Sequence, residues 1–241
     1  MTHEYDLAQV WVYLSASPLF GLTMTLLAYG LAYRVYVWGK SNPLLNPVVT
    51  AVALLIALLW LTHTPYQAYF EGGQFVHFLL GPATVALALP LYRQFGKLKT
   101  LWLAVLIALP VGVAVGGVSA VGIAWLLGAD TQTLLSLAPK SVTAPVAMGI
   151  AERIGGIPSL TAVLVVTTGI IGAVFGTKLF DVLRIRDDSV RGIAMGVAAH
   201  GIGTARAFQV SAEMGAFAGL AMALSAFVAS VMLPWLVSWL R

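Results

Sequence analysis

The chain has 241 residues, of which 60% are hydrophobic and 9% are charged, and its mean hydropathy is +0.93. A soluble domain carries about a quarter charged residues, so this composition excludes a soluble globular protein and indicates an integral membrane protein. The net charge of +4 arises in short loops and not in a basic arm, so nucleic acid is not expected as a partner, and the lack of cysteine excludes disulfides and thiol chemistry.

Apolar runs long enough to cross a bilayer as a helix, about 20 residues, recur along the chain. Runs such as LWLAVLIALPVGVAVGGVSAVGIAWLLG (101–128) lack the alternation of a β-barrel strand, so we predict an all-α integral membrane protein. The expected helices lie at 11–37, 46–62, 75–93, 101–127, 134–152, 157–182, 190–212 and 215–240. Their connections are too short to fold alone, which predicts a single polytopic membrane domain, residues 1–241, with about 7–8 hydrophobic segments.

Lysine and arginine are unevenly distributed over the loops and predict the orientation in a bacterial inner membrane. Residues 1–10 and 63–74 carry none, whereas the basic loop RQFGKLKT (93–100) lies on the other side, so the N-terminus is expected outside. A full crossing by 134–152 would place four later cations outside, against this rule: Lys178, Arg184, Arg186 and Arg191. The charges therefore favour a broken or re-entrant element at 134–152.

A weak internal repeat also involves this region. The segment 80–95 aligns with 137–152, and 143–152 aligns with 204–213, although an apolar chain produces some such matches by chance. Duplicated halves with helices interrupted by proline or glycine are common in secondary transporters, where the binding site lies at the breaks.

The first break in the apolar pattern is GPATVALALP, which contains Pro82 and Thr84. Proline removes a backbone donor and leaves a carbonyl available, so this segment can present a polar lining. An ordinary kinked membrane helix explains the same pattern.

The second break is PKSVTAP, in which Lys140 lies inside a segment bounded by two prolines. Lys140, the hydroxyls of Ser141 and Thr143, and backbone N–H groups at a helix start would together bind a carboxylate or phosphate. Alternatively, Lys140 extends to the nearby membrane interface, which lowers the cost of burying its charge.

The third break is AAHGIGTARAF, where glycines follow His200 and precede Thr204 and Arg206. The glycines permit a sharp bend, and the guanidinium of Arg206 offers paired donors for a carboxylate. Packing of small residues between helices is the alternative explanation.

Two carboxylates end the broken segments, Glu152 and Glu213. They are candidates for pairing with Lys140 or Arg206, for carrying a coupled proton, or for an interface position without a role in transport. The chain contains no Ser-His-Asp arrangement, HExxH motif, phosphate loop or metal-ligand cluster, so we expect no enzyme activity, no cofactor and no metal.

Several of these stretches resemble the LrgB/CidB family of bacterial membrane proteins. The similar stretches are NPLLNP (42–47), FLLGPATVALALPLYRQ (78–94), PKSVTAPVAMGIAERIGG (139–156), RGIAMGVAAHGIGTARA (191–207) and GAFAGLAMAL (215–224). The resemblance covers nearly the whole chain beyond about residue 17, and Gly149 departs from it where a larger or polar residue is expected.

The resemblance implies two alternative functions. Members are described as holin/antiholin-like modulators of murein hydrolase export and cell lysis that act beside a small LrgA/CidA-type partner. The family also includes the plastid glycolate/glycerate transporter, and bacterial relatives are linked to movement of pyruvate and similar monocarboxylates.

A cation with hydroxyls between broken helices suits a small carboxylate, so we expect a secondary transporter of monocarboxylates of the pyruvate, glycolate, glycerate or lactate type, with the holin-like modulator as the alternative. The transporter is expected to work by alternating access as a homodimer in the lipid bilayer. In this interpretation Lys140 and Arg206 neutralise the carboxylate, and His200 relays a proton or hydrogen bond. The remaining expected substrate-binding residues are Pro82, Thr84, Ser141, Thr143 and Thr204.

Overall fold

The structure is a computed structural model, and it describes residues 18–40, 42, 45–79, 82, 85–86 and 88–239. These residues form helices and no strand, so the predicted all-α membrane architecture is confirmed. Within them, three helices are long and apolar enough to cross a bilayer, with spans at Phe95–Leu126, Pro158–Val182 and Ala212–Val237. The chain divides into two compact units, Met1–Val85 and Ala86–Arg241, which are described separately.

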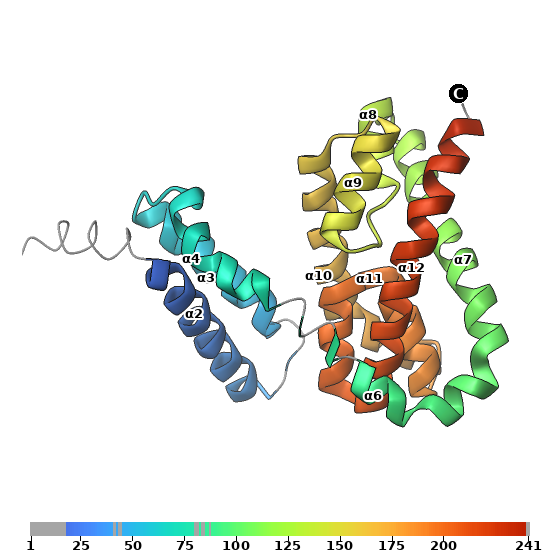
Figure 1. Cartoon of the computed structure of the whole chain (residues 1–241), viewed down its shortest axis with the longest axis horizontal. Helices are drawn as coiled ribbons and strands as arrows, with labels where there is room; N and C mark the ends of the chain where they lie inside the picture. The colour runs from blue at the N-terminus through green and yellow to red at the C-terminus, as the bar shows by residue number, and fades with distance from the viewer. Residues whose placement is uncertain are drawn as a thin grey trace, which may run out of the picture. The chain divides into compact units, whose positions relative to one another are not determined.

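The first unit contains α2 (Pro18–Trp38), α3 (Pro47–Leu61) and α4 (Tyr66–Phe78), and α2 packs against both of the others (Figure 1). The α3 helix begins at a buried Asn46, whose side chain accepts a 2.9 Å hydrogen bond from the Val48 N–H, with proline at the first helical position. Between α2 and α4, the hydroxyls of Thr25 and Tyr69 lie 2.7 Å apart. The helix predicted over 75–93 is not continuous in the described residues, because α4 ends at Phe78, Leu79 forms a turn and α6 is a separate helix at Ala88–Arg93.

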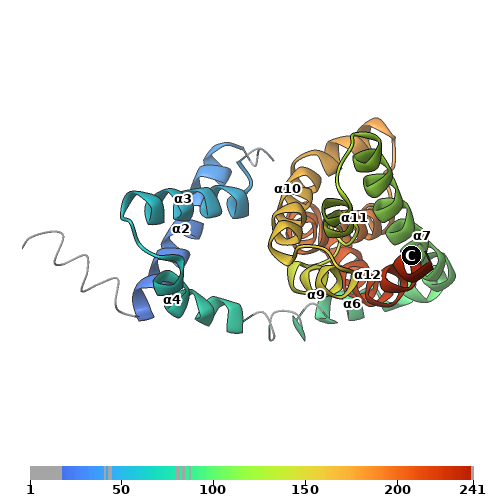
Figure 2. The same ribbon diagram turned by 90° about the horizontal axis from the view of Figure 1, so that it is seen from above.

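The second unit is organised by three long helices, α7 (Phe95–Leu126), α10 (Pro158–Val182) and α12 (Ala212–Trp239). The α7 and α12 helices lie side by side in both views (Figures 1 and 2). Each contains a proline, Pro110 in α7 and Pro234 in α12. Two helical hairpins, in which the chain reverses direction, pack against these long helices.

The first hairpin, residues 131–156, consists of α8 (Thr131–Leu137), a turn at 138–143 and α9 (Ala144–Ile154). The Ile157 N–H donates to Ser136 Oγ at 2.7 Å, and Gly156 packs against the Ser136 backbone, so the chain after α9 has returned to α8. The segment 134–152, where the loop charges favoured a broken or re-entrant element, is therefore broken into two short helices. Pro139 lies in the turn and Pro145 in the first turn of α9, where the missing proline N–H costs no helix hydrogen bond, so both residues are compatible with the interruption.

The second hairpin is α11 (Asp188–Val210), which changes direction at His200. His200 has φ 40° and ψ −131°, a left-handed backbone conformation that favours glycine. A straight helix of this length would separate its ends by roughly 35 Å, yet the Ser211 hydroxyl donates to the Asp188 carboxylate at 2.6 Å. The helix predicted over 190–212 therefore folds back on itself.

The two hairpins start from opposite ends of α7. The first follows the end of α7 after a short loop, whereas Lys97, near the start of α7, contacts residues on both sides of the second hairpin, Asp187 and Glu213. In Figure 1, α8 and α9 occupy one half of the second unit and α11 occupies the other. The aligned segments 143–152 and 204–213 thus follow corresponding turns of two oppositely directed hairpins.

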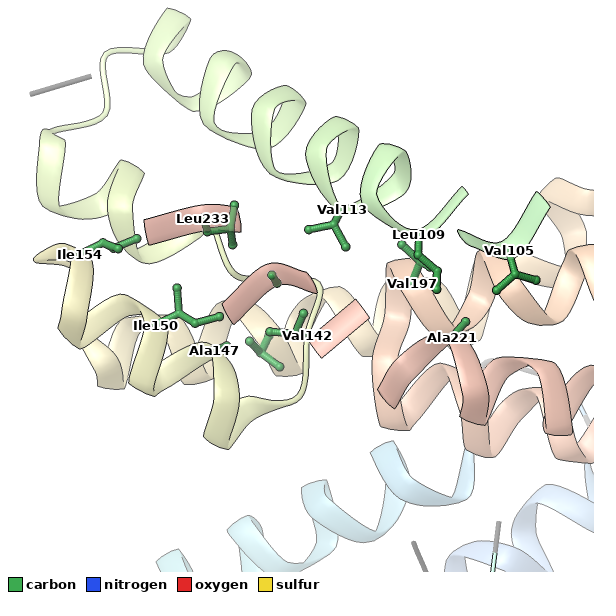
Figure 3. Close-up of a cluster of buried hydrophobic side chains, with 12 residues drawn as sticks. Val105, Leu109, Val113, Val142, Ala147, Ile150, Ile154, Val197, Ala221 and Leu233 are labelled. Atoms are coloured by element: carbon green, nitrogen blue, oxygen red, sulfur yellow. The ribbon is translucent and has the colours of Figure 1, made fainter. Parts of the chain in front are cut away.

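The turns of the hairpins meet in the interior of the second unit. Val142, beside the first turn, belongs to the same buried hydrophobic cluster as Val165 of α10 and Val197 of α11. Figure 3 shows Val142 and Val197 in this cluster together with residues of α7, α9 and α12. The core of the second unit therefore holds both turns in place.

Candidate anion-binding site

Lys140 lies in the turn of the first hairpin, between α8 and α9, and its side chain is half-buried. Its ammonium donates a 3.2 Å hydrogen bond to the hydroxyl of the neighbouring Ser141. Among the described residues, Lys140 makes no ion pair. Its positive charge is therefore not balanced by a carboxylate of that part of the chain.

A cleft of about 560 Å³ lies between α7 and the first half of α11 and reaches this turn. Of its described lining residues, only Lys140 and Ser141 have polar side chains. The others are Leu101, Ala104, Ala108, Gly112, Val115, Gly116, Val190, Ile193, Ala194, Val197 and Ala198. A small ligand in this cleft would meet one cation and one hydroxyl on an otherwise apolar surface.

The start of α9 adds positive potential at the same turn. Thr143 is the residue before the helix, and its hydroxyl makes no capping hydrogen bond to the helix N–H groups. Because the amino end of a helix carries a partial positive charge, it favours an anion nearby. Lys140, Ser141 and Thr143, which the sequence grouped in one motif, are thus close in space and chemically consistent with an anion site.

His200 lies at the opposing turn and is buried. Its Nε2 is 2.9 Å from the backbone carbonyl oxygen of Val165, and the Thr204 hydroxyl donates to the His200 carbonyl at 2.7 Å. His200 and Lys140 are close enough to interact electrostatically. Both His200 and Thr204 therefore support the shape of the second turn, and neither lines the cleft.

Arg206 lies in the second half of α11, beyond the turn. It is largely buried, and its Nη1 donates to Gln209 Oε1 at 3.1 Å. Arg206 is not among the residues that line the cleft with Lys140. The structure therefore does not place in this cleft both of the cations that were expected to share one carboxylate.

The two candidate carboxylates also lie away from Lys140. Glu152 is exposed near the end of α9, and Glu213, in the first turn of α12, forms an ion pair with Lys97 at 2.7 Å. Lys97 also pairs with Asp187 at 2.9 Å. Lys97 and Asp187 were not among the predicted site residues, and no local motif marks them, because they are 90 positions apart in the chain.

The GPAT segment is described only in part. Pro82 is exposed and belongs to the first unit, and Thr84 lies outside the described residues. The described residues contain no group of three or more histidine, aspartate or glutamate side chains placed to hold a metal ion.

These features define a multi-pass α-helical membrane protein with two opposed helical hairpins and a cation in the turn of one. The chain belongs to the LrgB-like family, whose model matches residues 25–239.

Bacterial relatives are similar over most of the chain. YxaC of Bacillus subtilis (strain 168), named as an uncharacterized protein, is 38% identical over 91% of this chain and 94% of its own length. YwbG of the same strain, also named as uncharacterized, is 36% identical over 91% of this chain and 97% of its own. The antiholin-like protein LrgB of Bacillus mycoides (strain KBAB4) is 32% identical over 90% and 95%, respectively. No solved structure matches the chain.

Proposed function

We propose that the protein is a secondary transporter, and not an enzyme, that carries small monocarboxylates of the pyruvate, glycolate, glycerate or lactate type across the bacterial cell membrane. One observation carries this proposal: Lys140 and Ser141 are the polar groups of a cleft whose other described lining residues are apolar. A cation at membrane depth costs a few kcal/mol, and a bound carboxylate lowers that cost by neutralising it.

The hairpins support a carrier mechanism. We propose that both are re-entrant, entering the membrane from opposite sides, because a break in a membrane helix is tolerated where it lines a cavity. This arrangement leaves the cations of the loop before α11 on the same side as Lys97, which agrees with the positive-inside rule. Alternating access then exposes the turn of the first hairpin to one side at a time.

We assign each residue a proposed role according to its position relative to the cleft. Lys140 binds one carboxylate oxygen, and the hydroxyls of Ser141 and Thr143 bind the second oxygen or the substrate hydroxyl. His200 and Thr204 hold the opposing turn. Two further sets of roles stay predictions: direct substrate binding by Arg206, Pro82 and Thr84, and coupling by Glu152 and Glu213. These roles require a conformation of the protein other than the one described.

The test is uptake of radiolabelled pyruvate, glycolate, glycerate and lactate by proteoliposomes that contain only this chain. We expect flux for at least one acid in the wild type, a loss of more than tenfold in Lys140→Ala, and partial retention in Lys140→Arg. Lys178→Ala is the matched control, because Lys178 is exposed on α10 and does not line the cleft.

Two results contradict the proposal at different levels. If the wild type shows no substrate-dependent flux, the chain is not a transporter by itself. If flux persists unchanged in Lys140→Ala, the protein transports carboxylates but Lys140 is not their countercharge.

A second candidate function is modulation of murein hydrolase export and cell lysis beside a small LrgA/CidA-type membrane partner. It is favoured by the name of a relative, the antiholin-like protein LrgB of Bacillus mycoides. This function predicts a change in autolysis on deletion, an effect of Lys140→Ala no larger than that of Lys178→Ala, and co-purification with the small partner. A homodimer, which we also propose, is tested by cross-linking in the membrane.

A further inference from the structure

Three charged side chains tie the start of α7 to the base of the second hairpin. Lys97 Nζ lies 2.9 Å from an Asp187 carboxylate oxygen and 2.7 Å from Glu213 Oε1. Asp187 precedes α11 and accepts hydrogen bonds from the Ser189 and Val190 N–H groups, while Glu213 is in the first turn of α12. The Lys97 network, as we call these three residues, thus joins three helices at one point.

From this network, α7 and α11 continue as the walls of the cleft that reaches Lys140. Leu101, one turn after Lys97 on α7, lines the cleft, and so does Val190, three residues after Asp187. At the other end, the lining residues are Gly116 of α7 and Ala198 of α11, beside Lys140 and Ser141. The cleft therefore extends from the Lys97 network to the turn of the first hairpin.

We propose that this cleft is the route by which an anion reaches Lys140, and that the Lys97 network closes the end of the cleft beside Leu101 and Val190. This inference rests on the proposed function, because it concerns the same site. With the network intact, α7 and the second hairpin are held together at their bases. When Lys97 separates from Asp187 and Glu213, the second hairpin can move away from α7, and water and a small carboxylate enter between Leu101 and Val190.

The charges and exposure of the network suit a closure that opens reversibly. Two carboxylates surround one ammonium, so the three side chains of the network together carry a net charge of −1. The side chains of Lys97, Asp187 and Glu213 remain 35%, 49% and 31% exposed, so each ion pair is weakened by water and readily broken.

The native chain contains no cysteine, so one introduced thiol reports on the cleft directly. Ala108→Cys places it on the cleft wall, about one turn before Gly112. The measurement is the rate at which an anionic methanethiosulfonate labels this thiol in proteoliposomes, without substrate. We expect the double variant Lys97→Gln and Glu213→Gln, which loses both partly exposed ion pairs but keeps the net charge of the network at −1, to raise the rate by roughly threefold to tenfold.

A charge exchange and a second thiol make the test specific. Lys97→Glu combined with Glu213→Lys restores an ion pair between α7 and α12, and the labelling rate should return toward that of the wild type. Leu106→Cys is the control position, because Leu106 is exposed on α7 but does not line the cleft. Its labelling should not change with the network.

An unchanged rate at Ala108→Cys in the double variant overturns the closure. An equal increase at Leu106→Cys also overturns it, because general loosening then explains the result. Labelling does not require transport, so the two proposals can fail separately. Faster labelling in a protein without carboxylate flux would support the closure and reject the transporter.

Discussion

The imidazole Nε2 of His200 lies 2.9 Å from the backbone carbonyl oxygen of Val165, which joins the turn of the second hairpin to the middle of α10. Val165 itself belongs to the buried cluster that includes Val142 of the first hairpin. One hydrogen bond and one hydrophobic cluster thus connect both turns to a single helix. The position of the Lys140 turn therefore depends on contacts made far from it in sequence.

We predict that His200→Gly destabilises the protein less than His200→Ala. Both variants lose the bond to Val165, but only glycine adopts the left-handed backbone at this position without strain. The difference in unfolding free energy should be about 1 kcal/mol, at the low end of the cost of such strained conformations. Thermal unfolding of the purified protein in detergent measures it, and an alanine variant as stable as the glycine variant would contradict the strained backbone.

We predict that Gly169→Ala destabilises the protein by about 1–3 kcal/mol, the usual effect of overpacking a core. A methyl group on Gly169 would lie 2.7 Å from Cε1 of the His200 ring, which is held in place by Val165. Gly122→Ala in α7 is the matched control, because an added methyl group there meets nothing within 4 Å. The control should be neutral or slightly stabilising, since alanine favours helix more than glycine does. Equal melting temperatures for the two variants would refute this packing.

A third prediction concerns the effect of Ser136, at the base of the first hairpin, on stability. Its buried hydroxyl donates to the Gln132 carbonyl at 2.6 Å and accepts from the Ile157 N–H at 2.7 Å. Ser136→Ala leaves that N–H without its partner, which should cost about 1–3 kcal/mol of stability. Ser230→Ala is the control, because the Ser230 hydroxyl bonds only within its own helix, to the Ala226 carbonyl. A loss no larger than in the control would mean that this bond does not hold the hairpin.

We predict that stability depends on pH through the carboxyl group of Asp187. Hydrogen bonds from Ser189 and then from Lys97 hold the pKa of the Asp187 carboxyl well below its ordinary value of about 4. Because the folded pKa is the lower one, the ionised carboxylate stabilises the fold above about pH 4, and this stabilisation is lost as the pH falls toward the folded pKa. Asp187→Asn retains a side chain able to cap α11 but removes the charge.

The melting temperature of Asp187→Asn should therefore fall below that of the wild type at pH 6–7, and the difference should shrink by pH 3. Added salt should also reduce the difference at pH 7, because it screens partly exposed ion pairs. A difference that stays constant between pH 3 and pH 7 would show that the charge of Asp187 does not stabilise the fold.

Local chemistry explains what could be predicted from the sequence. The apolar runs predicted the class of protein. The loop charges, together with Pro139 and Pro145, predicted the break near Lys140, because each proline removes a hydrogen bond from a helix interior. The glycines after His200 indicated a bend in the same way. Ser141 and Thr143 were grouped with Lys140 because they are its neighbours in the chain.

The remaining features depend on long-range contacts. The reversal of α11 requires Ser211 to meet Asp188, and the run 190–212 alone is equally compatible with one kinked helix. In the Lys97 network, Asp187 and Glu213 lie 90 and 116 positions away from Lys97 in the sequence, so no spacing rule reveals the network. Arg206 was expected beside Lys140 because both are cations within apolar segments, but it follows the turn of the other hairpin and contacts Gln209.

The position of the first turn along α7 has an electrical consequence. Ser141 lies against Gly116, which follows Phe95 by 21 of the 31 residue steps of α7 (116 − 95 and 126 − 95). If α7 spans the bilayer, an anion bound beside Lys140 has crossed only part of the transmembrane voltage, from whichever side it came. A full crossing is worth about 2.3 kcal/mol per charge for each 100 mV, so a fraction of that energy acts on binding itself. The membrane potential would then affect the occupancy of the site as well as the direction of flux.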